Sequence, residues 1–284
     1  MNKFIKERML KLDSLSRVID VAIRDSVPQI FKRPYLSVLP NTTLMQIAPF
    51  MAIGPQIYVD GLVVLEGEKP IGKISSKQIL LAIINSKYPD WLKKTALQIM
   101  DTSEISLEMD YPMSRAIDIF NQTSFAFIPI TKSGLVVASL SVRDVLPVIM
   151  TSTFHATLKD IASPLVILSK TTNLKLALNL MFQKKIRNII VESNNGYGII
   201  NDRKILEFLF SQNGRKIMDM NSLGIQAVEI DLVDKLSAMR VSDTTTVSKA
   251  AELLMDINIP CVLLNKSIVT PWDIVMKTIE RISI

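Results

Sequence analysis

One pattern occurs four times along this chain, and it constrains the fold more than any other feature of the sequence. Each copy has an apolar strand, a turn that begins with Ser, Thr or Asn, and then an apolar helix; the copies read GKISSKQIL, ASLSVRDVL, GIINDRKIL and SIVTPWDIV. Their first polar residues, Ser75, Ser141, Asn201 and Thr270, lie 66, 60 and 69 positions apart. Self-similarity at such a period is typical of repeated structural units.

The sequence before each turn predicts the rest of the unit. An apolar strand pair precedes each turn, and Gly134, Gly196 and the pair Asn265 and Lys266 are suited to the hairpin turns. Before the strand pair, apolar residues at helical spacing predict a helix, as in EMDYPMSRAIDIF and VSDTTTVSKAAELLM. Each repeat is therefore predicted to run strand, helix, strand, strand, helix, which is a mixed α/β (α+β) fold.

Composition narrows the class of protein. A chain of 284 residues with 48% apolar content can bury a sizeable core, and its length suggests about two domains. Its net charge of +6 comes from scattered Lys and Arg, which suits small phosphorylated ligands better than nucleic acid. The single cysteine, Cys261, excludes an internal disulfide, and we expect it to be a small buried residue of a strand. The single His155 offers neither a catalytic triad nor a metal cluster, so no metal site is expected.

The sequence does not favour a membrane location. The first residues, MNKFIKERMLKLDSL, carry charges throughout and predict a short basic amphipathic helix rather than a secretory signal. The uncharged stretch 34–59 contains four prolines and the turn-like PNTT, which argues against a spanning helix. We therefore expect a soluble, cytoplasmic protein with no membrane partner.

The ordered repeats resemble tandem CBS domains (cystathionine β-synthase domains), a family also found inserted in IMP dehydrogenase. The resemblance rests on four copies of a turn, a helix like T-[LV]-x-x-A, a hairpin and an [ST]-x-x-D helix start. It implies four CBS repeats in two Bateman modules, each with paired small sheets flanked by helices. The first module would span 1–150, with repeats at about 28–85 and 96–150, and the second 151–284, with repeats at about 156–212 and 215–284.

The resemblance also implies that clefts between paired repeats bind adenosine nucleotides. In the family the Asp of [ST]-x-x-D accepts hydrogen bonds from both ribose hydroxyls, and the Ser or Thr lies near the phosphate. The chemistry is sound, because a carboxylate offers two acceptor oxygens to a vicinal diol and a helix start attracts anions. The same residues are also good helix caps, so the turn Thr270 to Asp273 has two interpretations, a cap or a ribose clamp.

The four copies are unequal by this test. Thr270 with Asp273 and Ser141 with Asp144 match the family pattern. In the first repeat Gln78 takes the place of the Asp and accepts more weakly, and in the third Lys204 has no acceptor. We therefore expect one competent cleft in each module.

In the family the partner repeat contributes the segment before its first strand and the residues before its second strand. For the Asp273 cleft this implies the candidates Ser163, Pro164, Leu165, Val166, Arg187 and Asn188. Arg187 could fork onto a phosphate or be a solvated strand-end arginine. Leu165 and Val166 could cover the adenine or simply belong to a core strand.

For the Asp144 cleft the corresponding candidates are Lys32, Arg33, Tyr35 and Tyr58. Lys32 and Arg33 would hold the phosphate. Tyr35 or Tyr58 could stack on the base, and either is equally explained as a core or rim aromatic. Asp60 would oppose an anion in this cleft, so we expect it to bind more weakly than the Asp273 cleft.

Three functions follow from these features. The leading one is a non-catalytic sensor, a regulatory protein in the sense of energy sensing, that binds AMP or a related adenosine nucleotide and needs no catalytic cofactor. The alternatives are a nucleic-acid-binding or scaffolding CBS protein with vestigial clefts, and a binder of S-adenosyl compounds. An enzyme is not expected, because the repeats and linkers account for all the residues. The partners would be the nucleotide, an effector protein that the sequence does not identify and, through the modules, a second copy of the chain.

Overall fold

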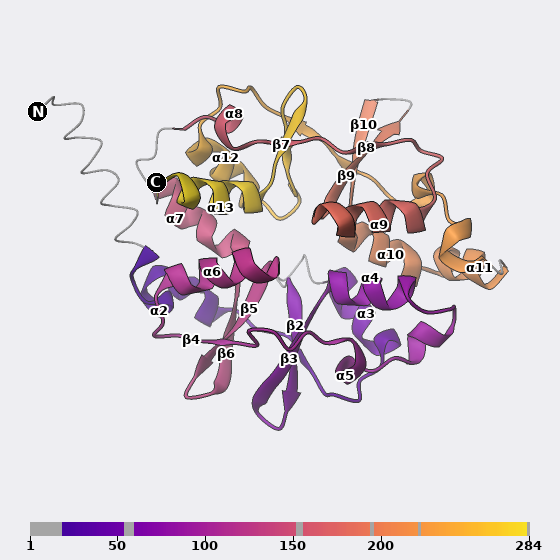
Figure 1. Cartoon of the computed structure of the whole chain (residues 1–284), viewed down its shortest axis with the longest axis horizontal. Helices are drawn as coiled ribbons and strands as arrows, with labels where there is room; N and C mark the ends of the chain where they lie inside the picture. Colours follow the sequence, from indigo (N-terminus) through magenta and orange to yellow (C-terminus); the bar gives the residue numbers. More distant parts are fainter. Residues whose placement is uncertain (1–18, 54–59, 152–155, 194–195, 221–222, 283–284) are drawn as a thin grey trace, which may run out of the picture. The chain divides into compact units, whose positions relative to one another are not determined.

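The described part of the chain forms four small sheets with helices beside them (Figure 1). The computed structural model describes residues 19–53, 60–151, 156–193, 196–220 and 223–282. Each sheet contains one parallel strand pair and one antiparallel hairpin, as the predicted order of strand, helix, strand and strand requires. The predicted mixed α/β fold of small sheets flanked by helices is confirmed.

Two compact units make up the chain. The first joins Met1–Tyr35, Ser106–Pro164 and Met239–Ile284, and the second joins Leu36–Ile105 and Leu165–Ala238. The second and fourth repeats therefore share the first unit, and the first and third repeats share the second. The division at residue 150 into two modules that are continuous in sequence stays a prediction.

The first unit holds two of the sheets, ordered β4-β5-β6 and β12-β13-β14-β7. Its elements are α2 (Ile23–Ser26), the 3-10 helix η1 (Pro28–Lys32), β4 (Leu107–Glu108), α6 (Met113–Thr123), β5 (Phe127–Lys132), β6 (Leu135–Ser141), the 3-10 helix η4 (Val142–Val145), α7 (Leu146–Thr151), α8 (Leu158–Ile161), β7 (Ser163–Pro164), β12 (Met239–Arg240), α12 (Val247–Leu254), β13 (Val262–Leu263), β14 (Ser267–Val269) and α13 (Pro271–Ile282).

The second unit holds the sheets ordered β1-β2-β3 and β11-β10-β9-β8. Its elements are β1 (Ser37–Val38), α3 (Leu44–Ile53), β2 (Gly61–Glu66), β3 (Lys69–Ser75), α4 (Ser76–Ile84), the 3-10 helix η3 (Asp90–Lys93), α5 (Ala96–Ile99), β8 (Ile167–Leu168), α9 (Leu174–Lys184), β9 (Asn188–Ser193), β10 (Gly196–Asn201), α10 (Asp202–Phe210), α11 (Gln212–Met220), the 3-10 helices η5 (Gly224–Ala227) and η6 (Ile230–Leu232), and β11 (Leu236–Ser237).

Glycines that the sequence indicated stand in the β5–β6 turn and at the start of β10. Gly134, between β5 and β6, has a φ of 79°, and Gly196, at the start of β10, has a φ of 120°. Residues other than glycine rarely adopt such positive φ angles, so these positions favour glycine. Asn265 and Lys266 lie between β13 and β14.

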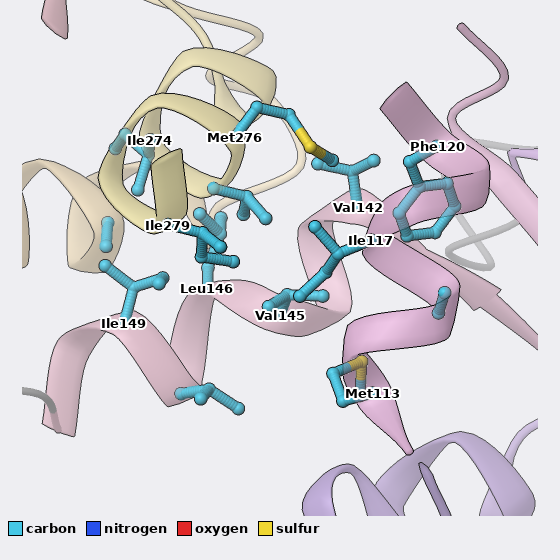
Figure 2. Close-up of a cluster of buried hydrophobic side chains, with 14 of the residues drawn as sticks. Met113, Ile117, Phe120, Val142, Val145, Leu146, Ile149, Ile274, Met276 and Ile279 are labelled. Carbon is cyan, nitrogen blue, oxygen red and sulfur yellow. The ribbon is translucent and has the colours of Figure 1, made fainter. Parts of the chain in front are cut away.

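Each unit has its own hydrophobic core. In the first unit α6, α7, α12 and α13 contribute side chains to one buried cluster, and α7 packs against α12. Figure 2 shows α13 facing η4 and α7, with labelled side chains Ile274, Met276, Ile279, Val142, Val145, Leu146 and Ile149. In the second unit α10 packs against α3, and Trp91 is buried with its ring edge-on to that of Phe210.

The segments that precede the odd-numbered repeats pack against the even-numbered ones. Ala22 forms a β-bridge with Pro112 at the start of the second repeat's first helix, and Thr157 forms the matching bridge with Thr246 in the fourth repeat. These bridges bring the following residues, near positions 33 and 163, alongside the second and fourth repeats. Both predicted helix-start carboxylates of the first unit therefore have a linker segment next to them.

A buried lysine in the second unit makes stability depend on pH. Lys73 in β3 has no exposed surface, and its Nζ donates to the Glu104 carbonyl oxygen over 2.7 Å. Burial lowers the pKa of Lys73 to about 8, although the Asp101 and Glu104 carboxylates partly oppose the shift. Because the folded pKa is below the unfolded one, the unfolded chain binds more protons between these values.

We therefore expect the free energy of unfolding to rise as pH increases from about 8 towards the unfolded pKa of Lys73, and to be lowest below pH 8. The contribution is roughly 2 to 3 kcal/mol, from the size of the shift and the remaining solvation. Urea unfolding between pH 7 and 10 measures it. Lys73→Met should flatten the profile, whereas Lys69→Met on the exposed end of the same strand should leave it like that of the parent. Identical profiles for all three chains would show that Lys73 does not titrate in this range.

Candidate functional site

All four repeated turns cap a helix, whichever residue stands at the fourth position. Gln78 accepts hydrogen bonds from the backbone and hydroxyl of Ser75, as an Asp would in a capping box. In the third repeat the Asn201 side chain accepts from the Lys204 backbone N–H over 2.9 Å, while Lys204 Nζ pairs with Glu207. Capping alone therefore does not distinguish the two Asp turns from the other two.

Asp273 lies at the start of α13 with only 5% of its surface exposed. Its Oδ2 accepts from the backbone N–H and the hydroxyl of Thr270, over 2.9 and 2.7 Å. Its Oδ1 accepts from the Ser163 hydroxyl over 2.6 Å and lies 2.9 Å from Lys277 Nζ. The structure thus brings together three residues predicted from sequence, Thr270, Asp273 and Ser163, and adds Lys277.

Asp144 lies at the corresponding place in the second repeat, 8% exposed. Its Oδ2 accepts from the Ser141 backbone N–H over 2.7 Å. Arg33 forks onto both carboxylate oxygens, with Nη1 2.7 Å from Oδ1 and Nη2 2.5 Å from Oδ2, and Nη2 also donates to the Ser139 carbonyl. Two charge-assisted bonds in this planar geometry make one of the stronger side-chain pairs available to a protein.

Arg33 and Ser163 occupy equivalent places in the two sites. Each stands directly before a proline, Pro34 or Pro164, and each contacts the helix-start Asp of the following repeat in its unit. Ser163 is held there because β7 pairs with β14, through Ser163 with Ile268 and Pro164 with Ser267. The positive charge beside the carboxylate therefore comes from the linker in one site and from α13, through Lys277, in the other.

The two carboxylates differ in the acceptor capacity that remains. A carboxylate has about four lone-pair sites. Asp273 receives four donors, from Thr270 twice, Ser163 and Lys277. Asp144 receives three, two of them from Arg33. A diol can bind either carboxylate only by replacing donors of the protein itself.

The two cations that a ligand must displace, Lys277 and Arg33, differ in the other acceptors that remain available to them. Lys277 has 34% of its side chain exposed and also donates to the Ile161 carbonyl and the Ser163 hydroxyl, so it keeps two acceptors if Asp273 is taken. Arg33 has 19% of its side chain exposed, and its buried Nε has no acceptor among the described residues. Arg33 therefore loses more of its hydrogen bonding than Lys277 does when a ligand binds the neighbouring Asp.

The other predicted residues that the structure describes in the first unit make no hydrogen bond or ion pair with Asp144 or Asp273. Lys32 ends η1 with its side chain exposed, Tyr35 is partly buried, and Pro164 is exposed in β7. Tyr58 lies outside the described residues. The parts of Lys32, Tyr35, Pro164 and Tyr58 in ligand binding stay predictions.

The remaining candidates lie in the second unit. Leu165 and Val166 precede β8 and are partly buried, and Asn188 begins β9 opposite Asn201. Arg187 Nε donates to Asp202 over 2.8 Å, and its Nη1 lies 3.7 Å from Asp60. Burial lowers the pKa of the Arg187 guanidinium, but the Asp202 and Asp60 carboxylates outweigh it and raise that pKa above its usual value.

Asp60 is shared between two arginines. Besides lying near Arg187, it accepts from Arg203 Nη2 over 2.5 Å. Its charge is therefore balanced inside the unit, where the sequence suggested that it would oppose an anion. The roles of Leu165, Val166, Arg187 and Asn188 in ligand binding stay predictions.

Sequence reasoning missed Lys277, Asp202 and Arg203. A signal for Lys277 was present, because it lies four residues after Asp273 on the same helix, and side chains at that spacing meet. Asp202 and Arg203 stand inside the third repeated turn, between Asn201 and Lys204, and the family pattern assigns no role to these two positions. Asp202 faces Arg187 across the β9–β10 hairpin, 15 positions away, so the hairpin pattern could have paired them. Asp60 is 143 positions from Arg203, and no local pattern pairs those two residues.

The remaining features concern the single cysteine, metal binding and membrane spans in the described residues. Cys261 is buried just before β13, and burial together with the nearby Asp273 charge raises the pKa of its thiol to about 12. Across residues 19–282, gaps excepted, no group of three or more His, Cys, Asp or Glu could hold a metal ion. No helix in the same described ranges is both long and apolar enough to cross a membrane. An open hollow of about 760 Å³ in the second unit is lined by Leu39, Asn41, Thr42, Gln46, Pro49 and Phe50, none of which is a predicted site residue.

Comparisons with known proteins agree with this fold. Residues 158–211 match the family model of the CBS domain. A search of curated proteins finds no match. A protein from Methanocaldococcus jannaschii, described as a proposed archaeal homologue of γ-AMPK, has a TM-score of 0.74 and 18% identity over 86% of this chain and 96% of its own. A conserved protein from Pyrococcus horikoshii has a TM-score of 0.53 and 12% identity over 87% of this chain and 96% of its own.

Proposed function

Because the chain carries tandem CBS repeats, we propose that it is a non-catalytic regulatory protein that binds an adenosine nucleotide, with AMP as the first candidate. The Asp273 site is proposed as the stronger of two sites and the Asp144 site as the weaker. The similar protein from Methanocaldococcus jannaschii supports the choice of ligand, since its description relates it to γ-AMPK.

The observation that carries the proposal is the surroundings of Asp273. A buried carboxylate at the start of a 12-residue helix stands beside a serine and a lysine from within the same unit. The carboxylate can accept from the two hydroxyls of a ribose, because both of its oxygens face hydroxyl or amine donors that a ligand can replace. The start of α13 favours an anionic phosphate, and Lys277 is a further cation for it when released from Asp273.

We expect AMP to raise the melting temperature of the chain. At a concentration about 100 times the dissociation constant, a ligand that binds only the folded state adds roughly 2.7 kcal/mol to the free energy of unfolding. A thermal-shift panel of AMP, ADP, ATP, S-adenosylmethionine, NAD, GMP and IMP identifies the ligand class, because only adenosine compounds should shift the transition.

Generic duplex DNA serves as the comparison in that panel. Binding that falls steeply with salt and is unaffected by AMP would favour the nucleic-acid or scaffold interpretation. If S-adenosylmethionine raises the melting temperature and AMP does not, the proposed site would stand and its ligand would be an S-adenosyl compound. No shift with any adenosine compound at millimolar concentration would contradict the proposed function.

A further inference from the structure

We propose that Arg33 holds the Asp144 site closed and that a nucleotide enters only by displacing it. The proposal rests on the proposed function, and it adds a conformational switch that the repeat pattern does not contain. Arg33 occupies both oxygens of Asp144, the atoms that the ribose hydroxyls need. The pair is therefore a competitor for the ligand within the protein itself.

The geometry of the pair explains why it competes strongly. A guanidinium matches a carboxylate with two parallel bonds, and both side chains are largely buried, with 19% and 9% of their side-chain surfaces exposed. The Ser139 carbonyl holds the same Nη2 in place. A ribose must break an ion pair with two parallel bonds and replace it with hydrogen bonds from two uncharged hydroxyls, which lowers its apparent affinity.

The Asp273 site has the equivalent arrangement with a serine in place of the arginine. Ser163 stands at the position of Arg33 and fills one lone pair of Asp273 with a neutral hydroxyl. The nearby cation, Lys277, comes from α13 and has other acceptors to turn to. Residue 33 therefore determines how firmly the protein's own donors hold the carboxylate that a ligand must reach.

Displacement of Arg33 also has a consequence for the N-terminal segment. Arg33 directly follows η1, which packs against β6, and the Arg33 bonds to Asp144 and Ser139 help to tie that segment to the second repeat. A nucleotide in the Asp144 site would therefore loosen the attachment of residues 33–35 while the buried Ile30 stays packed. The segment can report whether the site is occupied.

The test uses the full chain carrying Asp273→Ala, so that the Asp144 site is measured by itself. Adenosine is the probe, because it lacks the phosphate that a displaced Arg33 could hold. Arg33→Ser, which copies Ser163, should bind adenosine at least tenfold more tightly than the Asp273→Ala chain in a calorimetric titration. Arg33→Lys should give an intermediate gain, because an amine cannot occupy both oxygens. Arg24→Ser in the same N-terminal segment should give none, since Arg24 pairs with the exposed Asp110 instead.

The outcomes separate this proposal from the proposed function. An affinity for adenosine in Arg33→Ser no higher than in the Asp273→Ala chain, including no binding in either, overturns the role of Arg33. Titration of the unmodified chain with AMP tests the proposed function independently, because the Asp273 site does not involve Arg33. If Arg33→Ser unfolds at the working temperature, Arg33→Lys decides: a gain supports displacement, and unchanged binding contradicts it.

Discussion

Replacing Asp273 with alanine is expected to lower the affinity for AMP at least tenfold. The variant loses the carboxylate that accepts from the ribose diol, and a hydrogen bond to a charged group contributes roughly 1.5 to 3 kcal/mol. Every 1.4 kcal/mol corresponds to about a tenfold change in the dissociation constant. Calorimetric titration of the parent and variant chains with AMP measures the loss.

The same substitution should affect folding much less. Thr270 keeps its hydroxyl to cap α13, and Lys277 keeps the Ile161 carbonyl and the Ser163 hydroxyl as acceptors. We expect a loss of about 1 kcal/mol in the free energy of unfolding, the usual size for a cap. Thermal unfolding without ligand therefore distinguishes a binding defect from a folding defect.

Two further variants complete the comparison. Asp144→Ala should weaken the second site in the same way from a lower starting affinity, because Arg33 already competes there. Lys204→Ala is the matched control: it stands at the equivalent position of the third repeat, where its Nζ pairs with Glu207 and offers no acceptor. If Lys204→Ala abolishes AMP binding while Asp273→Ala titrates like the parent, the turn at Thr270 is only a helix cap.

Phe120→Ala is expected to cost about 3 to 5 kcal/mol of stability in the first unit, the largest structural effect that we predict. Phe120 has no exposed surface and lies in α6 beside Val142, the first residue of the helix start that carries Asp144 (Figure 2). Alanine would leave a cavity that the surrounding helices fill only in part. Urea unfolding measures the loss of stability. Hydrogen exchange of the backbone amides in β5 and β6 shows whether the first unit is the part that opens.

Tyr111→Ala supplies the control for the core substitution. Its ring is also an aromatic side chain of the first unit, but the residue is 51% exposed, so its removal should change stability by no more than about 0.5 kcal/mol. Phe120→Leu should fall between the two, because leucine fills part of the space. Equal stabilities for Phe120→Ala and Tyr111→Ala would show that α6 does not pack as described.

The order of strands and helices within each repeat was predictable because short segments of the sequence determine it. Apolar strands, glycine turns and polar helix starts set strand and helix periods without any distant contact. The same holds for the helix caps at Ser75, Ser141, Asn201 and Thr270, which all formed. The mixed α/β order of elements followed from four copies of these signals, and the resemblance to CBS domains implied the small sheets.

The composition of the two units was not predictable in the same way. The helix contacts that define the first unit join α7 of the second repeat to α12 of the fourth, and those of the second unit join α3 to α10. A repeat pattern says that the faces are apolar, but it does not say which copy covers which.

The state of the two carboxylates also required the structure. The sequence identified Asp144 and Asp273 as matching the family pattern, and it identified Arg33 as a residue near the first of them. It could not show that Arg33 would take both oxygens, since pairing over 111 positions depends on how the linker crosses the second repeat. Whether an acceptor is free is a property of three-dimensional packing, and a motif does not encode it.

The central claim, that this chain binds an adenosine nucleotide at the Asp273 site, is tested most directly by calorimetric titration of the unmodified full chain with AMP. We predict saturable binding that is retained at raised salt and in Lys204→Ala and that weakens at least tenfold in Asp273→Ala. Absence of saturable heat with AMP, together with salt-sensitive binding of generic DNA by the same sample, would contradict the account.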